Sequence, residues 1–193
     1  MNKAEIRKAA ILERKKLTPE QVETLSIQIR NQFATLDFSA VNVIHLFLPI
    51  LEKNEPDTFL IVDWLKENHP HIKIIIPRAN FGNSLMTHHA FTSKEDLKKN
   101  EYGIPEPFPV DVHIGKIDMV LVPMLAFDLH GYRVGYGKGF YDRFLQGLDA
   151  KKVGLNFFEA QNQISNVDEY DVRLDLCITP QKIYAFSSNN TGQ

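Results

Sequence analysis

Three long apolar runs constrain the fold of this chain more than any other feature of its sequence. They are VNVIHLFLPI at residues 41–50, IKIIIPRA at residues 72–79 and IDMVLVPMLAF at residues 117–127. Runs that lack a strict alternation with polar residues are typical of strands whose two faces are both covered. Shorter runs predict further strands at residues 84–91, 151–158 and 174–180. The chain is therefore expected to build a sheet that lies between two covering layers.

Segments with helical spacing separate these strands. They predict helices at residues 3–17, 19–33, 56–69 and 141–148. Thr18 is expected to cap the second helix, because it precedes a proline at the first helical position. Alternating strands and helices indicate an α/β fold: a single-domain, three-layer α/β/α sandwich, Rossmann-like, with a mainly parallel or mixed sheet. For a chain of 193 residues we expect one domain over residues 1–186 and a disordered tail at residues 187–193.

Charge and cysteine content argue against several classes of protein. The net charge of −2 is unlike that of a basic nucleic-acid-binding chain. A single cysteine, Cys177, excludes an internal disulfide and, in a strand-like run, is expected to be a buried thiol. No apolar run approaches the roughly 18 residues of a membrane span, and the charged start lacks a signal-peptide pattern. We expect a cytoplasmic monomer that binds small molecules and neither nucleic acid nor membranes.

The glycine segment, RVGYGKGFYDRFL at residues 133–145, follows the strand at 117–127. Glycine permits positive φ and lets a ligand approach the backbone closely. Successive backbone N–H groups that open onto a helix form an anion-binding concavity. Ligands of parallel sheets lie beyond the carboxyl ends of the strands, where this segment is expected. The spacing matches neither the P-loop nor the dinucleotide-binding fingerprint, so a plain connecting turn is the alternative.

Charged side chains at this segment favour a role in phosphate binding. Arg133 and Lys138 can hold phosphate oxygens, whereas Asp142 beside a phosphate is useful only with a cation such as Mg²⁺ between them. In the first predicted helix, Lys3, Arg7 and Arg14 fall within about 40° of one another. Their alternative role is to pair with carboxylates or to extend into solvent. Together the charges suggest a site for a nucleoside triphosphate and its metal.

A longer stretch, VPMLAFDLHGYRVGYGKGFYDRFL at residues 122–145, resembles the signature of the 5-formyltetrahydrofolate cyclo-ligase family, also called methenyltetrahydrofolate synthetases. Shorter pieces match in the same order: an N-terminal K-x-x-x-R, NEPDT, GIPEP and DVRLD. The resemblance implies an enzyme with ATP as co-substrate and Mg²⁺ as cofactor. Its reaction would close 5-formyltetrahydrofolate to 5,10-methenyltetrahydrofolate by phosphorylating the formyl oxygen, with release of ADP and phosphate.

The resemblance also implies roles for individual residues. ATP would contact Lys3, Arg7, Arg133, Val134, Gly135, Tyr136, Gly137, Lys138, Gly139, Phe140 and Tyr141. The expected catalytic residues are Tyr141, Lys138 and Arg133, the folate would meet Ile50 and Glu55, and the metal would meet Asp142 and Asp171. Phe140 stands where the family usually has tyrosine. Gln161 lies one position later than a glutamine of the family, so we leave it and Ala160 out of the site.

Two other classes stay open on the residues alone. One is a sugar-phosphate isomerase or a CoA-transferase-like enzyme on a related scaffold, which would bind phosphate without using ATP. The other is a non-catalytic nucleotide-sensing or nucleic-acid-binding module. The histidines do not predict a metal site, since His88 and His89 are adjacent in a strand and face opposite sides. His45 and His113 have no partner at a metal-binding spacing.

Overall fold

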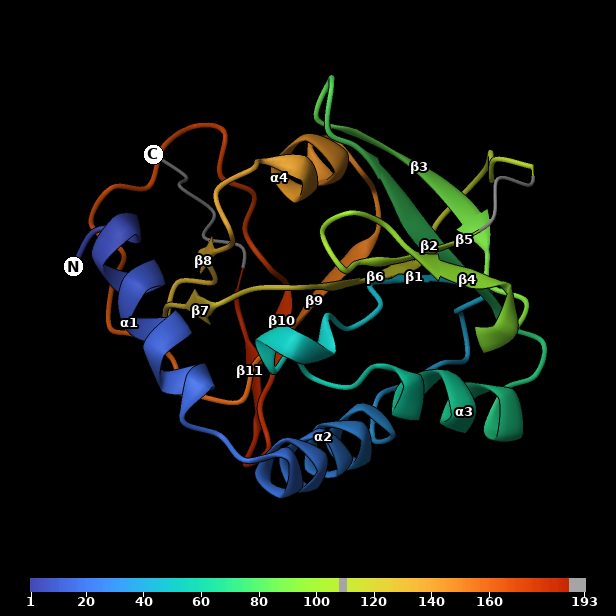
Figure 1. The fold of residues 1–193 in the computed structure, drawn as a ribbon, viewed down its shortest axis with the longest axis horizontal. Helices are drawn as coiled ribbons and strands as arrows, with labels where there is room; N and C mark the ends of the chain where they lie inside the picture. Colours follow the sequence, from blue (N-terminus) through green and yellow to red (C-terminus); the bar gives the residue numbers. More distant parts are fainter. Residues whose placement is uncertain (108–110, 188–193) are drawn as a thin grey trace.

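Seven strands form the central sheet in the computed structural model, which describes residues 1–107 and 111–187 (Figure 1). Their order across the sheet is β11 (Ile183–Ala185), β10 (Leu176–Ile178), β9 (Lys151–Leu155), β6 (Met119–Val122), β1 (Val43–Leu46), β2 (Lys73–Asn80) and β3 (Leu85–Ala90). The inner strands pair in parallel, and the edge strands β11 and β3 pair antiparallel to their neighbours. The expected α/β fold with a mainly parallel sheet is confirmed.

Helices cover both faces of this sheet (Figure 1). The helices α2 (Pro19–Phe33) and α3 (Phe59–Asn68) lie together on one face, and the short α4 (Phe140–Leu145) lies on the other. Successive residues of a strand point to opposite faces. Ile74 and Ile76 of β2 accordingly join the core under α2 and α3, whereas Ile75 joins the core under α4. Burial on both faces explains why the strand sequences lack polar alternation.

The first helix, α1 (Lys3–Lys15), lies beside the ribbon of β7 (Ala126–Phe127) and β8 (Arg133–Val134) rather than on the sheet (Figure 1). Asn2 and Glu5 form a capping box at its start. Ile6 packs against Ala126 and Val134 in a small separate core. This contact places the N-terminal end of the chain against the glycine segment.

The strand expected at residues 117–127 is wrong in its extent, because the structure divides it. β6 ends at Val122, and the following Pro123 has no N–H with which to continue the ladder. The chain then leaves the sheet, and the Leu125 backbone N–H donates to the Val134 carbonyl at 2.7 Å. β7 pairs antiparallel with β8, which was not expected from the sequence.

Short segments contain structure that the sequence did not predict. Residues 92–107 contain the 3₁₀ turn η2 (Lys94–Asp96) and a small ribbon of β4 (Leu97–Lys99) and β5 (Pro105–Pro107). The helix expected from residue 56 begins at Phe59, and a 3₁₀ turn, η1 (Leu51–Lys53), precedes it. The capping of α2 by Thr18 is confirmed, with Thr18 accepting from the Gln21 N–H. The expected tail falls mostly at residues 188–193, which are outside the described residues.

Two smaller expectations concern the burial of Cys177 and membrane-spanning segments. Cys177 is fully buried in β10, and burial raises the pKa of its thiol well above the usual range. No helix within the described residues combines the length and the apolar character needed to cross a membrane.

We predict that Phe33→Ala lowers the free energy of unfolding by about 3–5 kcal/mol, because it removes a fully buried ring. Phe33 lies at the centre of an aromatic cluster, with ring centroids 5.1 Å from Phe38 and 5.9 Å from Trp64. Urea unfolding followed by circular dichroism measures the change. Leu12→Ala, at a side chain that is 51% exposed, serves as the control and should alter stability by less than about 1 kcal/mol.

Candidate active site

A cavity of about 1260 Å³ lies at the carboxyl ends of the inner parallel strands. Its walls come from α1, the segment after β1, the β2–β3 hairpin, the glycine segment, α4 and the loop before β10. Every residue that the sequence analysis placed in the site lines it: Lys3, Arg7, Ile50, Glu55, Arg133, Val134, Gly135, Tyr136, Gly137, Lys138, Gly139, Phe140, Tyr141, Asp142 and Asp171. The fold thus brings together residues from four distant parts of the chain, and their individual roles stay predictions.

The glycine segment needs glycine at two positions for a steric reason. Gly137 has φ of 90° and Gly139 has φ of 73°, values that L side chains rarely adopt. A Cβ at Gly139 would also lie 2.7 Å from the Arg143 guanidinium. At Gly137 the nearest group is the Arg7 guanidinium, 3.4 Å from where a Cβ would stand. Arg7 is held there because its Nε donates to the Gly135 carbonyl at 2.8 Å.

Two of the cations in the cavity lining, Arg133 and Lys3, are paired with carboxylates. Arg133 is buried, and its two Nη atoms donate to the Val172 carbonyl and to Asp142 Oδ1, each at 2.9 Å. The Lys3 ammonium lies 2.5 Å from Asp171 Oδ2. Lys138 is exposed at the mouth of the cavity. The site therefore contains a set of cations of which Arg133 and Lys3 are balanced by carboxylates.

The two predicted metal-binding carboxylates, Asp142 and Asp171, lie close to each other in the fold. Asp142 Oδ1 accepts from the N–H of Val172, which follows Asp171 in the chain. Within residues 1–107 and 111–187, no group of three or more histidine, cysteine or acidic side chains has a geometry that could hold a metal. Mg²⁺ in phosphate-transfer sites is commonly held by one or two carboxylates, together with substrate phosphates and water. The pair therefore fits a magnesium ion that arrives with a nucleotide.

The cavity lining also contains a buried acid, Glu55, which is 4% exposed. Burial raises the pKa of its carboxyl to about 7, against the opposing effects of Arg14, the Ile50 backbone N–H and Lys53. The neighbouring Asn54 adopts a left-handed conformation, and its side chain donates to the Arg14 carbonyl at 2.8 Å. The turn that carries Glu55 is thus fastened to the last turn of α1.

An apolar wall of the cavity was not predicted from the sequence. It consists of Pro77, Ala79, Phe81, Leu85, Met86, Tyr102, Ile104 and Pro105. The Phe81 ring lies 4.1 Å from Tyr102 and 5.2 Å from Phe140, measured between centroids. These residue types are ordinary in a β-hairpin and a loop, so only their arrangement in space indicates a binding surface. Neither Ala160 nor Gln161 lines this cavity; both line a separate one of about 320 Å³.

Tyr141 belongs to α4, and two histidines lie beneath this helix. The Tyr141 hydroxyl is buried with no hydrogen-bond partner among the described residues, and burial raises its pKa above the usual range. His45 Nε2 and His88 Nδ1 lie 2.9 Å apart, although the sequence indicated no partner for His45. The two rings pack against Phe144 of α4. They support the helix that carries Tyr141.

Together the fold and the cavity define an α/β enzyme-like site in which a glycine-rich backbone segment, a buried acid and an apolar wall line one cavity. The sequence profile of the 5-formyltetrahydrofolate cyclo-ligase family matches residues 1–180. The chain belongs to this family.

Individual relatives agree with this assignment. A 5-formyltetrahydrofolate cyclo-ligase of Escherichia coli K12 is 28% identical over 181 residues, covering 89% of this chain and 96% of the relative. One of Mus musculus is 32% identical over 147 residues, covering 68% and 70%. Among solved structures, the Aquifex aeolicus 5,10-methenyltetrahydrofolate synthetase matches with a TM-score of 0.81 and 26% identity, over 100% of this chain and 97% of that one.

We predict that acidification destabilises the fold through the two histidines under α4. Burial lowers the pKa of His88 from 6.5 to about 4, and it lowers the pKa of His45 well below 6.5. Below pH 6.5 these histidines bind protons in the unfolded chain but not in the folded chain. Their contribution to the free energy of unfolding is therefore complete above pH 6.5 and declines as the pH falls toward 4.

Urea unfolding of the protein and of His88→Gln at a series of pH values tests this. The variant should lose less stability than the parent between pH 6.5 and 4. Parallel curves for the two proteins would contradict the assignment to these histidines.

Proposed function

We propose that this chain catalyses the reaction of its family, the ATP-dependent cyclisation of 5-formyltetrahydrofolate to 5,10-methenyltetrahydrofolate, with release of ADP and phosphate. One observation carries the proposal. A single cavity is lined by the glycine segment with its cations, by a buried acid and by an apolar wall. A triphosphate suits the first of these groups, and a flat pterin ring with polar edges suits the other two.

The chemistry asks mainly for positioning. A formamide carbon is a poor electrophile, because the nitrogen lone pair is delocalised into the carbonyl, and its oxygen would have to leave as hydroxide or oxide. Transfer of the γ-phosphoryl group to that oxygen releases ADP and makes the carbon electrophilic. The second folate nitrogen then forms its bond to this carbon, and the oxygen departs as part of inorganic phosphate. No nucleophilic side chain is needed, since alignment and charge neutralisation supply most of the rate of phosphoryl transfer.

On the nucleotide side we assign Arg7, Lys138 and the glycine backbone to the phosphates. Arg133 and Lys3 are paired with Asp142 and Asp171 before substrate binds. Mg²⁺ bound with ATP would neutralise phosphate charge, and these two carboxylates are the groups that would hold it. Arg133 and Lys3 would then be free to donate to phosphate oxygens, and ion pairs with the substrate would replace the ion pairs within the wall.

On the folate side we assign Glu55 and Ile50 to the ring, with the apolar wall stacked along it. The carboxylate of Glu55 can accept from ring N–H groups. The hydroxyl of Tyr141, which has no hydrogen-bond partner among the described residues, is available to donate a hydrogen bond that orients the formyl group toward the γ-phosphoryl group. Arg133, Lys138 and Tyr141 are therefore the residues proposed to act at the reacting groups.

We further infer a monomer that acts in a reducing compartment such as the cytoplasm. The single buried thiol supports this inference. Its ligands are ATP and a folate, and nucleic acid is not among them.

We expect the protein to produce the near-ultraviolet band of methenyltetrahydrofolate when 5-formyltetrahydrofolate, ATP and Mg²⁺ are supplied together. The product has a conjugated chromophore that the substrate lacks, so absorbance follows the reaction directly. Omitting ATP should abolish the band. A band that forms equally well without ATP, or none with all components, would overturn the proposal.

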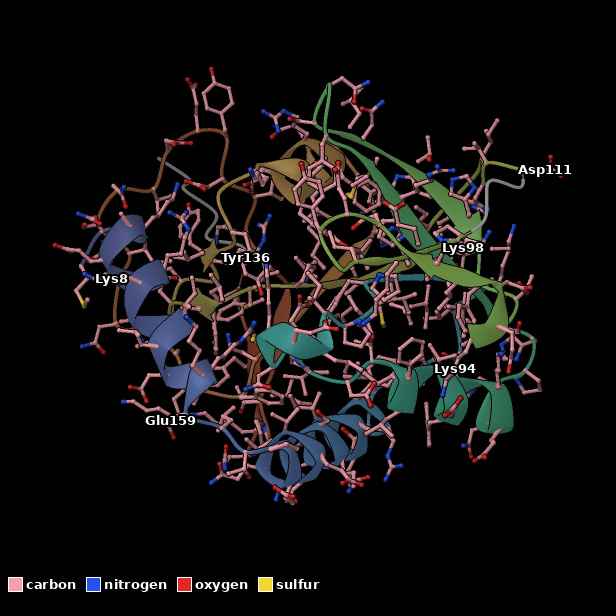
Figure 2. All side chains as sticks on the ribbon, in the orientation of Figure 1. Lys8, Lys94, Lys98, Asp111, Tyr136 and Glu159 are labelled. Atoms are coloured by element: carbon pink, nitrogen blue, oxygen red, sulfur yellow. The ribbon has the colours of Figure 1, made fainter. Side chains whose placement is uncertain are left out.

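Lys138→Ala should raise the apparent KM for ATP roughly 10- to 100-fold, the effect of losing one charged hydrogen bond of about 1.5–3 kcal/mol. The KM for the folate should change much less, because Lys138 is assigned to the phosphates and not to the folate. Lys8→Ala, at an exposed lysine on the outer side of α1, is the matched control (Figure 2). Steady-state kinetics with each substrate varied in turn measure both constants, and an unchanged KM for ATP would remove Lys138 from the site.

A further inference from the structure

Arg14 is a buried cation that the site described above does not use. It is 3% exposed, although it belongs to the last turn of a helix at the surface. A buried charge is costly unless it is paired and hydrogen-bonded. Lys15 and Lys16, the next two residues, are exposed, so the burial of Arg14 is specific to its position.

The guanidinium of Arg14 is directed toward the cavity wall. One Nη donates to the Met124 carbonyl, at the point where the chain leaves β6. The other Nη donates to the Tyr136 hydroxyl at 3.4 Å. Its Nε has no partner among the described residues. The charge is therefore only partly satisfied by its own hydrogen bonds, and a nearby anion is needed to balance it.

Tyr136 joins Arg14 to Glu55. It lies between α1 and the turn η1 (Figure 2), where the Lys53 ammonium stands 4.5 Å from the centre of its ring. Its hydroxyl lies 3.5 Å from Glu55 Oε1. No direct ion pair joins Arg14 and Glu55, so the hydroxyl is the connecting group between a buried cation and a buried acid.

We propose that Arg14 is a positioning residue of the folate subsite: acting through the Tyr136 hydroxyl, it holds the Glu55 side chain ionised and oriented toward the cavity. Because Tyr136 belongs to the glycine segment, the same contact ties the order of the nucleotide wall to that of the folate wall. This inference rests on the proposed function, in which Glu55 meets the folate.

The groups that face Glu55 come from four elements. Arg14 of α1 and Lys53 of η1 are cationic and favour its ionised form, as does the Tyr136 hydroxyl. Tyr141 of α4 is neutral and lies close enough for its own pKa to be raised by the Glu55 charge, after the larger effect of burial. Arg14 is the strongest of the favourable influences, so its removal should raise the Glu55 pKa above about 7.

The experiment measures kcat/KM for 5-formyltetrahydrofolate against pH, with Mg·ATP saturating. In the parent enzyme this constant should rise with pH as Glu55 ionises. In Arg14→Met the midpoint should move up by about one unit or more, so that activity with folate below the midpoint falls roughly tenfold. The KM for ATP should change less than about twofold. Arg14→Lys keeps the charge and should restore part of the shift.

A second variant and a control separate positioning from support of the fold. Tyr136→Phe removes only the connecting hydroxyl and should move the midpoint in the same direction by a smaller amount. Lys8→Met removes an exposed cation from the same helix and should leave the midpoint unchanged. The inference would be overturned if Arg14→Met and Tyr136→Phe both lowered the melting temperature but left the midpoint of the pH profile unchanged. Arg14 would then only stabilise the fold, through its hydrogen bond to the Met124 carbonyl.

A double-mutant cycle with Glu55→Gln makes the test specific. Arg14→Met should lower kcat/KM for the folate severalfold less in the Glu55→Gln background than in the parent. If Arg14→Met lowered kcat/KM by the same factor in both backgrounds, the two residues would act independently, which would contradict a shared role. If the parent enzyme shows no ATP-dependent chromophore, the proposed function fails by itself. The Glu55 carboxyl titration, followed by carbon-13 NMR in the parent and Arg14→Met, still decides whether Arg14 controls the acid.

Discussion

The interruption of the sheet ladder after Val122 is the constraint on which the rest of the structure depends. Pro123 cannot donate to a neighbouring strand, so the chain leaves the sheet at the carboxyl edge and pairs with itself as β7 and β8. That ribbon directs the glycine segment across the strand ends and gives α1 a surface to pack on. Arg7 lines the cavity, and Arg14 contacts Tyr136 of the cavity lining, only because α1 is held there. A continuous β6 would leave neither wall in place.

The charges of the nucleotide wall illustrate how such a site is stable before its substrate arrives. Unbalanced cations in a partly buried cleft would repel one another and would be poorly solvated. Here Arg133 is balanced by Asp142, and Lys3 by Asp171. The arrangement keeps each side chain near its working position, so little further ordering is needed when a phosphate and a cation replace the internal partners. Preorganisation of this kind is where electrostatic catalysis obtains most of its effect.

The sequence predicted those parts of the molecule that depend on local pattern. The apolar runs specify buried strands, and the glycines specify a turn with positive φ, because strand period and positive φ are properties of neighbouring residues. It could not predict β8, which is a two-residue strand formed by a contact with β7. Nor could it pair His45 with His88, since these residues meet only across the sheet. The sequence could not predict the apolar wall for a related reason. Phe81 and Tyr102 form a surface only when the hairpin and the β4–β5 ribbon are folded together.

The cluster of Arg14, Tyr136 and Glu55 shows why a costly arrangement can be retained. Burial of a cation and an acid rarely adds net stability, since desolvation of the two charges offsets their attraction. The advantage of burying these two charged groups is therefore sought in function. Burial alone would leave Glu55 protonated near neutral pH, and a protonated acid loses half of its acceptor capacity toward a ring edge. A cation placed behind a tyrosine hydroxyl opposes that tendency without blocking the cavity. Because the tyrosine is also part of the glycine segment, ordering one subsite reduces the conformational entropy that remains to be lost at the other, which favours a reaction that needs both substrates aligned at once.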